Sequence, residues 1–203
     1  SHAMMQGRVS GVEFDVGIFT NLSQDHLDYH RNMEEYYRAK REFFRMVESE
    51  PTASGIVVNS DDPHGQRLLR EISIFNVSYG MEGNARLTAR NVELRNNGTK
   101  CELHTASGTY SASLAPIGRH NIYNALGALG AVQLLDADVG KAVESLSSLA
   151  PVPGRLEAIQ VGQDFNVVVD YAHTSDALEN VLNTLRELTP GRVLVTFGCG
   201  GCR

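Results

Sequence analysis

Two short apolar runs separated by an amphipathic stretch constrain the fold of this chain most strongly. Residues 12–19 and Gly55-Ile-Val-Val-Asn59 have the composition of buried strands. Between them, apolar side chains recur at helical spacing over Met33–Val47, and Asn32 with Glu35 forms a capping-box signature at the start of this helix. A strand, a helix and a second strand in this order predict an α/β fold with a parallel sheet.

Lys40 is an anomaly on this predicted helix. At 100° per residue it falls in the middle of the apolar stripe. One interpretation is that its aliphatic stem lies along apolar surface while its amine reaches water or a carboxylate, and the spacing alone favours this one. The other is that burial lowers the pKa of the amine and leaves a neutral nucleophile. The stripe consists of Met33, Tyr36, Tyr37, Phe43, Phe44 and Val47.

Four potential metal ligands or acid–base groups follow the first strand within six residues, namely Asp25, His26, Asp28 and His30. The carboxyl end of a strand in an α/β sheet is where ligands bind. His26 and His30 could form a zinc pair if helical, but no third ligand with zinc-like spacing follows. Carboxylates beside a single histidine suit Mg²⁺ better. The alternative is that Asp25 and Asp28 cap local turns, and the spacing leaves both open.

Asp61 and Asp62 follow the second strand directly and precede Pro63. Paired carboxylates at such a place fit a catalytic role in acid–base chemistry. However, an aspartate before a proline at the first helical position is ordinary helix-start chemistry. We therefore favour helix capping for this pair.

The middle of the chain changes character. Residues 85–93, 100–105 and 109–114 alternate between apolar and polar and are separated by Asn-Asn-Gly and Ala-Ser-Gly turns. This pattern predicts an antiparallel meander at the edge of the domain, without identifiable chemistry. A helix that is apolar or small nearly all round is expected from Pro116 to about Leu135, and we expect it to be buried.

The last part of the chain predicts a second α/β unit. Residues 165–170 are expected to form a buried strand, a helix follows from about residue 175, and residues 192–197 are expected to form the next strand. Such a β-α-β unit should cross over right-handed into a parallel sheet. Asp170 and His173 would then lie at the carboxyl end of a strand, where nucleotides bind.

Composition excludes several classes of function. A net charge of −6 and a pI near 5.6 give no overall basic surface for nucleic acid. We find no apolar run of the ~20 residues that a membrane span needs, and no signal peptide. Three cysteines in 203 residues, an odd count, suit a reducing cytosol. We therefore expect a cytoplasmic protein with neither nucleic acid nor membrane as a partner.

A glycine-rich loop with two cysteines ends the chain, Gly198-Cys-Gly-Gly-Cys-Arg203. A glycine-rich loop after a strand can cradle an anion, but the Gly-Lys-[Ser/Thr] pattern of a phosphate loop is missing. The Cys199-x-x-Cys202 pair could instead belong to a thioredoxin-like or zinc module, and one pair is weak evidence for either.

Several motifs, taken together, resemble the Mur ligases over essentially the whole chain. Within this family, the resemblance is to the ligases that add the third residue of the peptidoglycan stem peptide. The motifs are Phe19-Thr-Asn-Leu-Ser-Gln-Asp-His-Leu-Asp-Tyr-His30, Tyr37-Arg-Ala-Lys40, Gly118-Arg-His-Asn-x-x-Asn-Ala125, Gly154-Arg-Leu-Glu157, Asp170-Tyr-Ala-His-Thr174 and the Gly-Cys-Gly-Gly loop from Gly198.

The resemblance implies a metal site and a nucleotide site. His26 would be a magnesium ligand, and Lys40 would be carbamylated so that its carbamate helps to hold a second Mg²⁺. For ATP, the implied residues are Asn121 and Asn124 beside the adenine, Arg155 at the phosphates, Asp170 at the ribose, and His173 nearby with Thr174. Arg203 would contact the carboxylate of the incoming amino acid, and His2, if native rather than part of a cloning scar, would lie near the sugar nucleotide. Cys202 departs from the aspartate that the family has there.

The resemblance also implies the domain organisation and the reaction. Residues 1–150 would be most of a central ATP-binding domain, 151–158 a hinge in the Pro- and Gly-rich linker, and 159–203 the start of a Rossmann-like C-terminal domain. The reaction would join meso-diaminopimelate or L-lysine to UDP-N-acetylmuramoyl-L-alanyl-D-glutamate through an acyl phosphate. Because the family's phosphate loop is absent, we expect the chain to be part of a longer enzyme and to be inactive alone. The alternatives are a folylpolyglutamate-synthetase-like ligase and a non-catalytic nucleotide-binding or Cys-x-x-Cys module.

Overall fold

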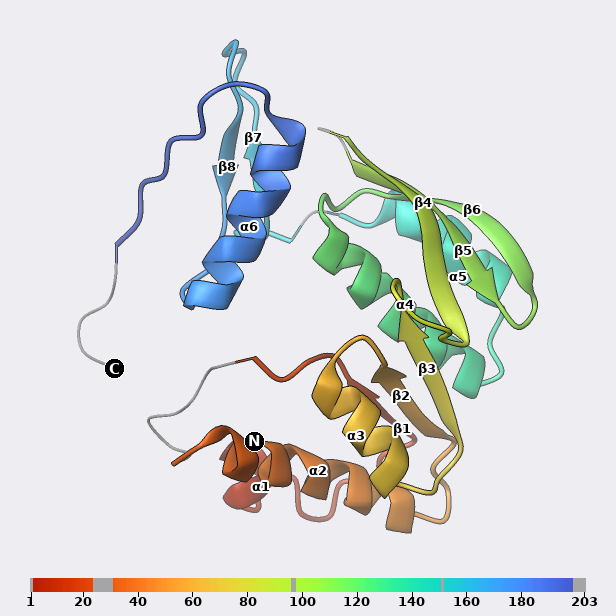
Figure 1. Cartoon of the computed structure of the whole chain (residues 1–203). Coiled ribbons are helices and arrows are strands. Elements are labelled where there is room, and N and C mark those ends of the chain that lie inside the picture. Colours follow the sequence, from red (N-terminus) through yellow and green to blue (C-terminus); the bar gives the residue numbers. More distant parts are fainter. Residues whose placement is uncertain (1, 24–30, 96–97, 151, 199–203) are drawn as a thin grey trace.

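The computed structural model describes residues 2–23, 31–95, 98–150 and 152–198 (Figure 1). Helices and strands alternate in the first part of the chain, and three consecutive strands follow. The elements are α1 (His2–Met5), β1 (Val16–Phe19), α2 (Met33–Ser49), β2 (Gly55–Asn59), α3 (Pro63–Glu71), β3 (Asn76–Gly80), β4 (Leu87–Arg95), β5 (Gly98–Thr105), β6 (Gly108–Leu114), α4 (Arg119–Leu134), α5 (Val139–Ser145), the 3₁₀ helix η1 (Leu146–Ser148), β7 (Glu157–Ile159), β8 (Val167–Val169) and α6 (Ser175–Leu188).

A six-stranded sheet in the order β1-β2-β3-β4-β5-β6 forms the frame of the first 150 residues. β1, β2 and β3 pair in parallel, and β3 also pairs in parallel with the start of β4. β4, β5 and β6 pair antiparallel, which confirms the predicted meander at the edge of the sheet. The parallel strands end together at one edge, so the polar residues that follow them lie on the same side of the molecule.

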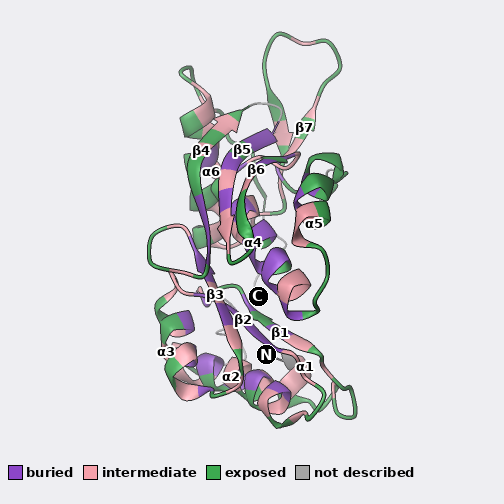
Figure 2. Ribbon diagram, turned by 90° about the vertical axis from the view of Figure 1, so that its right-hand side faces the viewer, coloured by how far each residue is buried: buried purple, intermediate pink, exposed green. Residues whose placement is uncertain are grey.

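Helices cover both faces of the parallel part of the sheet (Figure 2). Val57 of β2 packs in the cluster of α4 and α5, whereas its neighbours Ile56 and Val58 pack in the cluster of α2 and α3. α4 lies close to the sheet because it carries glycine there: a Cβ on Gly130 would lie 2.4 Å from Cγ1 of Val57. The sequence prediction of a buried helix is therefore confirmed for α4.

α2 begins as its sequence predicts. Asn32 is the N-cap, and its side-chain oxygen accepts a hydrogen bond of 2.9 Å from the Glu35 amide. The Glu35 carboxylate accepts from the Arg31 amide at 3.2 Å, one residue before the position that a capping box uses.

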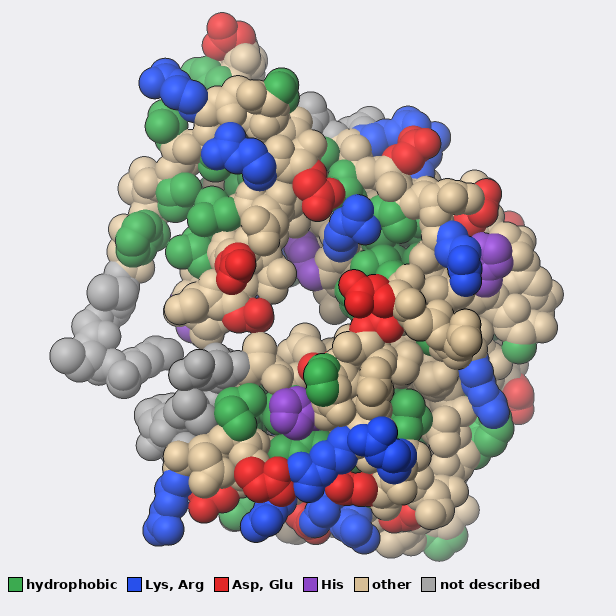
Figure 3. Space-filling model, in the orientation of Figure 1, with side chains coloured by type: hydrophobic (Ala, Val, Ile, Leu, Met, Phe, Trp, Pro, Cys, Tyr) green, Lys and Arg blue, Asp and Glu red, His purple; other side chains and the backbone are tan. Residues whose placement is uncertain are grey.

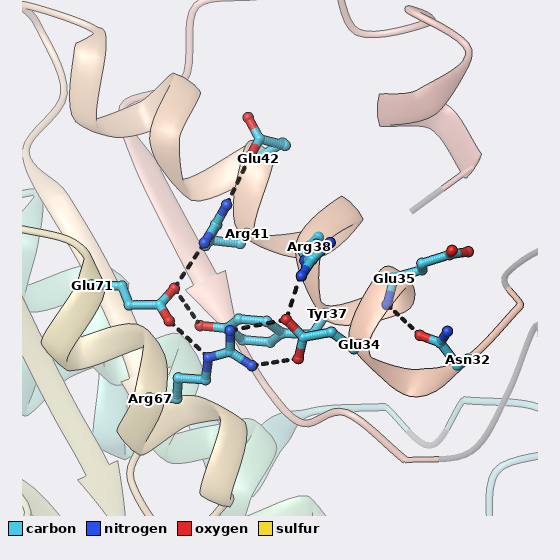
Figure 4. A network of polar contacts seen from close by, with 9 residues as sticks. All are labelled: Asn32, Glu34, Glu35, Tyr37, Arg38, Arg41, Glu42, Arg67 and Glu71. Carbon is cyan, nitrogen blue, oxygen red and sulfur yellow. Dashed lines mark hydrogen bonds and ion pairs between the residues drawn. The ribbon is translucent and has the colours of Figure 1, made fainter.

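A network of charged side chains joins α2 to α3 on the outer surface (Figure 4). The Arg67 guanidinium donates to both carboxylate oxygens of Glu34, at 2.6 and 3.0 Å, and to Glu71 at 2.7 Å. The second oxygen of Glu71 accepts from the Tyr37 hydroxyl at 3.1 Å and from Arg41 at 3.2 Å. This network fixes the relative position of the two helices that cover one face of the sheet.

The last part of the chain differs from its sequence prediction. β8 forms where a strand was expected, but it pairs antiparallel with β7 instead of entering a parallel sheet. The expected buried strand over 165–170 is largely exposed, and residues 192–197 form no strand. A strand needs a hydrogen-bonded partner and cover on its faces. In the described part of the chain, nothing pairs with residues 192–198.

Among the described residues, no helix has the length and apolar character needed to cross a membrane.

Candidate functional site

A cleft of about 860 Å³ lies between the first 150 residues and the C-terminal unit of β7, β8 and α6. Figure 3 shows it as the hollow near the centre of the molecule. This volume is within the range of small-molecule sites, roughly 300–1,000 Å³. Its walls come from the loop after β1, the start of α4, the linker near residue 155, and the loop between β8 and α6. The residues that the resemblance assigns to ATP all line it, namely Asn121, Asn124, Arg155, Asp170, His173 and Thr174.

The α4 wall presents amide groups. The Asn121 side-chain nitrogen donates to the Ile117 carbonyl oxygen at 2.8 Å, and the Asn124 nitrogen donates to the Asn121 side-chain oxygen at 3.2 Å. The N-cap position, Gly118, has no side chain to cap the helix. Asn121 thus ties the first turn to the chain before it, while Asn124 is exposed toward the cleft.

Asp170 holds the linker against the loop that follows β8. One carboxylate oxygen accepts from the Leu156 amide and the other from the Ala172 amide, both at 2.7 Å. The Tyr171 amide donates to the Gly154 carbonyl oxygen at 2.8 Å, which adds a further contact between the linker and this loop. Leu156 has φ of 43°, a left-handed conformation that is uncommon for leucine, and its side chain is buried. Asp170 therefore stabilises a strained linker conformation and still has lone pairs available for a ligand.

Among the described residues, Arg155 contacts an aromatic ring and forms no ion pair. Its guanidinium lies over the ring of Tyr171, 5.3 Å from the ring centroid. His173 lies next to the same tyrosine, with ring centroids 5.0 Å apart and Nδ1 3.0 Å from the Tyr171 carbonyl oxygen. Tyr171 thus organises a cation and an imidazole on one wall of the cleft.

The loop after β1 forms the opposite wall, where Asn21 and Ser23 line the cleft. The Lys40 amine donates to the Asn21 carbonyl oxygen at 3.0 Å, and it lies 5.1 Å from the centroid of the Tyr36 ring. Lys40 is only partly buried. The unmodified amine thus lies at a backbone carbonyl oxygen and beside an aromatic ring, and both interpretations of Lys40 stay predictions.

Several predicted site residues lie outside the described residues: Asp25, His26, Asp28, His30, Cys199, Cys202 and Arg203. His2 belongs to α1, but its side chain lies outside the description as well. Within the described ranges, no group of three or more His, Cys, Asp or Glu side chains could hold a metal ion.

The sequence prediction missed some residues of the cleft, among them His120 and Tyr171. Both belong to motifs of the resemblance, so the signal was present although no role was assigned. His120 lies with its Nε2 3.1 Å from the Asn121 side-chain nitrogen. Burial lowers the pKa of His120, and the negative charge of Asp170 opposes this shift. Burial therefore favours the neutral imidazole here.

Known protein families match most of the chain. The Mur ligase middle domain matches residues 1–132, and the glutamate ligase domain of the Mur ligases matches residues 154–203. The chain therefore belongs to the Mur ligase family, a family of ATP-utilising enzymes.

Relatives at higher similarity carry a more particular name. UDP-N-acetylmuramoyl-L-alanyl-D-glutamate–2,6-diaminopimelate ligase of Bacillus licheniformis is 41% identical over 206 residues, covering 100% of this chain and 42% of the relative. A solved structure with the same enzyme name matches with a TM-score of 0.79 at 30% identity, over 100% of this chain and 42% of its own. The chain thus spans about two fifths of the length of these relatives.

A folylpolyglutamate synthase also has this fold. The Mycobacterium tuberculosis enzyme, solved with ADP and AMPPCP, matches with a TM-score of 0.72 at 22% identity, over 87% of this chain and 40% of its own. At this identity the likeness concerns the fold alone.

Proposed function

We propose that the full-length protein containing this chain is an ATP-dependent amide ligase that joins meso-diaminopimelate to UDP-N-acetylmuramoyl-L-alanyl-D-glutamate. The observation that carries the proposal is the cleft, in which residues from four distant motifs lie together. The name and the 41% identity of the Bacillus licheniformis relative support this acceptor and this amino acid over L-lysine or a folate substrate.

The cleft residues would bind ATP between the two units. Asn121 and Asn124 offer amide donors and acceptors that suit the edge of an adenine. Arg155 is a permanent cation for the phosphates, and its stacking on Tyr171 orders the side chain before the ligand arrives. The free lone pairs of Asp170 can accept from ribose hydroxyls, and His173 lies beside Tyr171 on the same wall. We propose that residues 151–158 act as the hinge between a central domain, 1–150, and a C-terminal domain, 159–203.

The reaction would proceed in two steps. The glutamate carboxylate of the acceptor attacks the γ-phosphate of ATP, which forms an acyl phosphate and releases ADP. The amine then attacks the acyl carbon, loses a proton and displaces inorganic phosphate to form the amide. Arg155 would bind the phosphates throughout. By the family resemblance, Arg203 would contact the carboxylate of the incoming amino acid, and His2 would lie near the sugar nucleotide.

We also propose that His26 and a carbamylated Lys40 hold Mg²⁺, which neutralises charge on the phosphates when bound. The fit of Lys40 rests on its place beside the cleft: its amine contacts the carbonyl of Asn21, and Asn21 lines the cleft. A carbamate at this amine would replace a cation with oxygen ligands, which are the donors that Mg²⁺ prefers.

Phosphate release by the full-length protein tests the function. With ATP, Mg²⁺ and the UDP-muramoyl dipeptide, we expect release that depends on meso-diaminopimelate and not on L-lysine.

The same assay tests Lys40. Lys40→Ala should abolish release, and a short-chain carboxylate should restore part of it. Arg95→Ala, an exposed residue of β4 far from the loop after β1, is the control. An active Lys40→Ala protein would refute the carbamate role, and a protein that binds ATP without amino-acid-dependent release would refute the ligase.

A further inference from the structure

Asp61 and Asp62, the carboxylates that follow β2, differ in their contacts. Neither lines the cleft. Asp62 caps α3 as predicted: one of its oxygens accepts from the amides of His64 at 2.7 Å and Gly65 at 3.2 Å. Asp61 caps no helix, so the capping prediction is wrong for this residue. Its contacts are with a strand end and with α4, neither of which is adjacent to it in sequence.

Asp61 joins the end of β3 to the first turns of α4. One carboxylate oxygen accepts from the amides of Met81 at 2.6 Å and Glu82 at 3.2 Å, and from the Tyr123 hydroxyl at 2.8 Å. The site is shaped for this carboxylate, because a Cβ on Gly80 would lie 2.5 Å from its other oxygen. Burial, and then the hydrogen bond to Asp61, raise the pKa of Tyr123, so this hydroxyl stays protonated and donates.

Tyr123 fixes the wall of the cleft that carries the amides. It lies between Asn121 and Asn124 in sequence, on the first turns of a helix whose N-cap offers no side-chain hydrogen bond. Besides the bond to Asp61, two polar contacts hold this helix start: the Asn121 side chain donates to the Ile117 carbonyl oxygen, and the Gly118 amide donates to the Thr99 hydroxyl at 3.3 Å. Charge-assisted bonds such as that of Asp61 are stronger than bonds between neutral groups.

Asp62 fixes the opposite wall with its second oxygen, which accepts from the Leu22 amide at 2.9 Å. Leu22 is buried, and the residues on either side of it, Asn21 and Ser23, line the cleft. Asn59 supports the same loop: its side-chain nitrogen donates to the Thr20 carbonyl oxygen at 2.8 Å. The loop is therefore held near the carboxyl end of β2 at two points, Thr20 and Leu22.

We propose that Asp61 and Asp62 are positioning residues that fix two walls of the cleft from one rigid point, the end of the buried strand β2. Asp61 sets the α4 wall through Tyr123, and Asp62 sets the β1-loop wall through the Leu22 amide. The inference rests on the proposed function for its ligand, ATP. Its physical basis is that binding groups must be held close to their productive geometry by a supporting shell of hydrogen bonds.

The α4 wall is tested by Tyr123→Phe and Asp61→Asn in the full-length protein. Each change removes or weakens the bond while nearly conserving shape. We expect the dissociation constant of Mg²⁺-ATP, measured by calorimetric titration, to rise about tenfold. The KM for meso-diaminopimelate should stay within about twofold, since that substrate does not contact α4 in the proposed arrangement. The double variant should bind Mg²⁺-ATP no more weakly than either single variant, because the two substitutions remove the same contact.

The β1-loop wall is tested by Asp62→Ser. Serine is a good N-cap and keeps the bond to the start of α3, but its single short oxygen cannot also reach the Leu22 amide. We expect ATP affinity to fall several-fold while the unfolding temperature stays near that of the wild type.

Two matched variants serve as controls. Tyr110→Phe removes a hydroxyl in the meander that contacts Ser107, and Asp138→Asn keeps the N-cap of α5. Both should bind ATP like the wild type. Wild-type ATP affinity in Tyr123→Phe and Asp62→Ser would overturn the inference, as would a loss of affinity that only parallels a loss of folded protein in circular dichroism. Because the titration needs no turnover, it decides the inference even if the full-length protein releases no phosphate, a result that would overturn the proposed function alone.

Discussion

Two runs of three β-branched residues, one in β2 and one in β8, differ in how far they are buried. Ile56-Val57-Val58 in β2 is completely buried, whereas Val167 and Val169 of β8 are 37% and 47% exposed. β2 lies between two hydrogen-bonded neighbours and beneath helices on both faces of its sheet, while β8 pairs only with β7. In the described part of the chain, α6 is the helix beside β8, and Val168 lines a small cavity with Leu185 and Leu188.

This difference shows that an apolar run in the sequence indicates only a preference for burial. The number of layers around the strand decides whether that preference is met. Several other large apolar side chains of the C-terminal unit are exposed in the same way, including Val161, Phe165, Leu194 and Phe197. A stability difference between the two units should follow, and two pairs of substitutions test it.

The largest effect is expected from truncating the two strands. Ile56→Ala should lower the free energy of unfolding by about 2–5 kcal/mol, because it removes a fully buried side chain and leaves a cavity. Val169→Ala should cost less than about 1 kcal/mol, because much of this side chain is already in water. Urea unfolding of both variants measures the difference. Equal losses would show that Val169 is as well covered in solution as Ile56.

A smaller effect is expected from adding a methyl group between α4 and the sheet. Gly130→Ala places a Cβ 2.4 Å from the Val57 side chain and should destabilise by about 1–3 kcal/mol, because the helix must move away. Gly198→Ala is the matched change in the C-terminal unit, where a Cβ would meet no atom within 4 Å. An unchanged unfolding temperature in the Gly130→Ala variant would show that α4 does not pack tightly against Val57.

The smallest effect concerns the charged network between α2 and α3. The hydrogen bonds from Arg67 lower the pKa of Glu34 from 4.5 to about 2. In the unfolded chain this carboxylate takes up a proton near pH 4.5, and in the folded chain only near pH 2. The unfolded state therefore binds more protons between these values, and stability should fall as the pH drops through this window. The stabilisation from the Glu34–Arg67 pair should be fully present above about pH 5.

Urea unfolding at a series of pH values from 6 to 3 measures this slope. Glu34→Gln should flatten it, since glutamine has no proton to take up. The control is Glu144→Gln, on α5 and away from the network. High salt should also reduce the effect, because the pair is exposed to solvent. An unchanged slope in Glu34→Gln would show that the network does not persist in solution.

Much of the local structure could be predicted from the sequence, because its causes are local. The Asn32 cap, the buried strand Gly55–Asn59 and the Asp138 cap of α5 each follow from a few neighbouring side chains. The family resemblance also identified several of the residues that line the cleft, although it assigned no role to His120 or Tyr171. Motifs as far apart in the sequence as those of Asn21 and His173 lie on one cleft, because strand ends and helix starts share one edge of an α/β fold.

The tertiary structure decided what depends on distant partners. The pattern Asp61-Asp62-Pro63 predicts a capped helix start, but nothing in it distinguishes the two carboxylates. Asp61 turns to Tyr123, which is 62 residues away, and only the packing of α4 on the sheet brings the two together. Residues 192–197 have the composition of a strand but lack a paired neighbour in the described chain. Local patterns determine what a segment prefers, whereas hydrogen-bond partners and covering layers, which come from elsewhere in the chain, determine what it becomes.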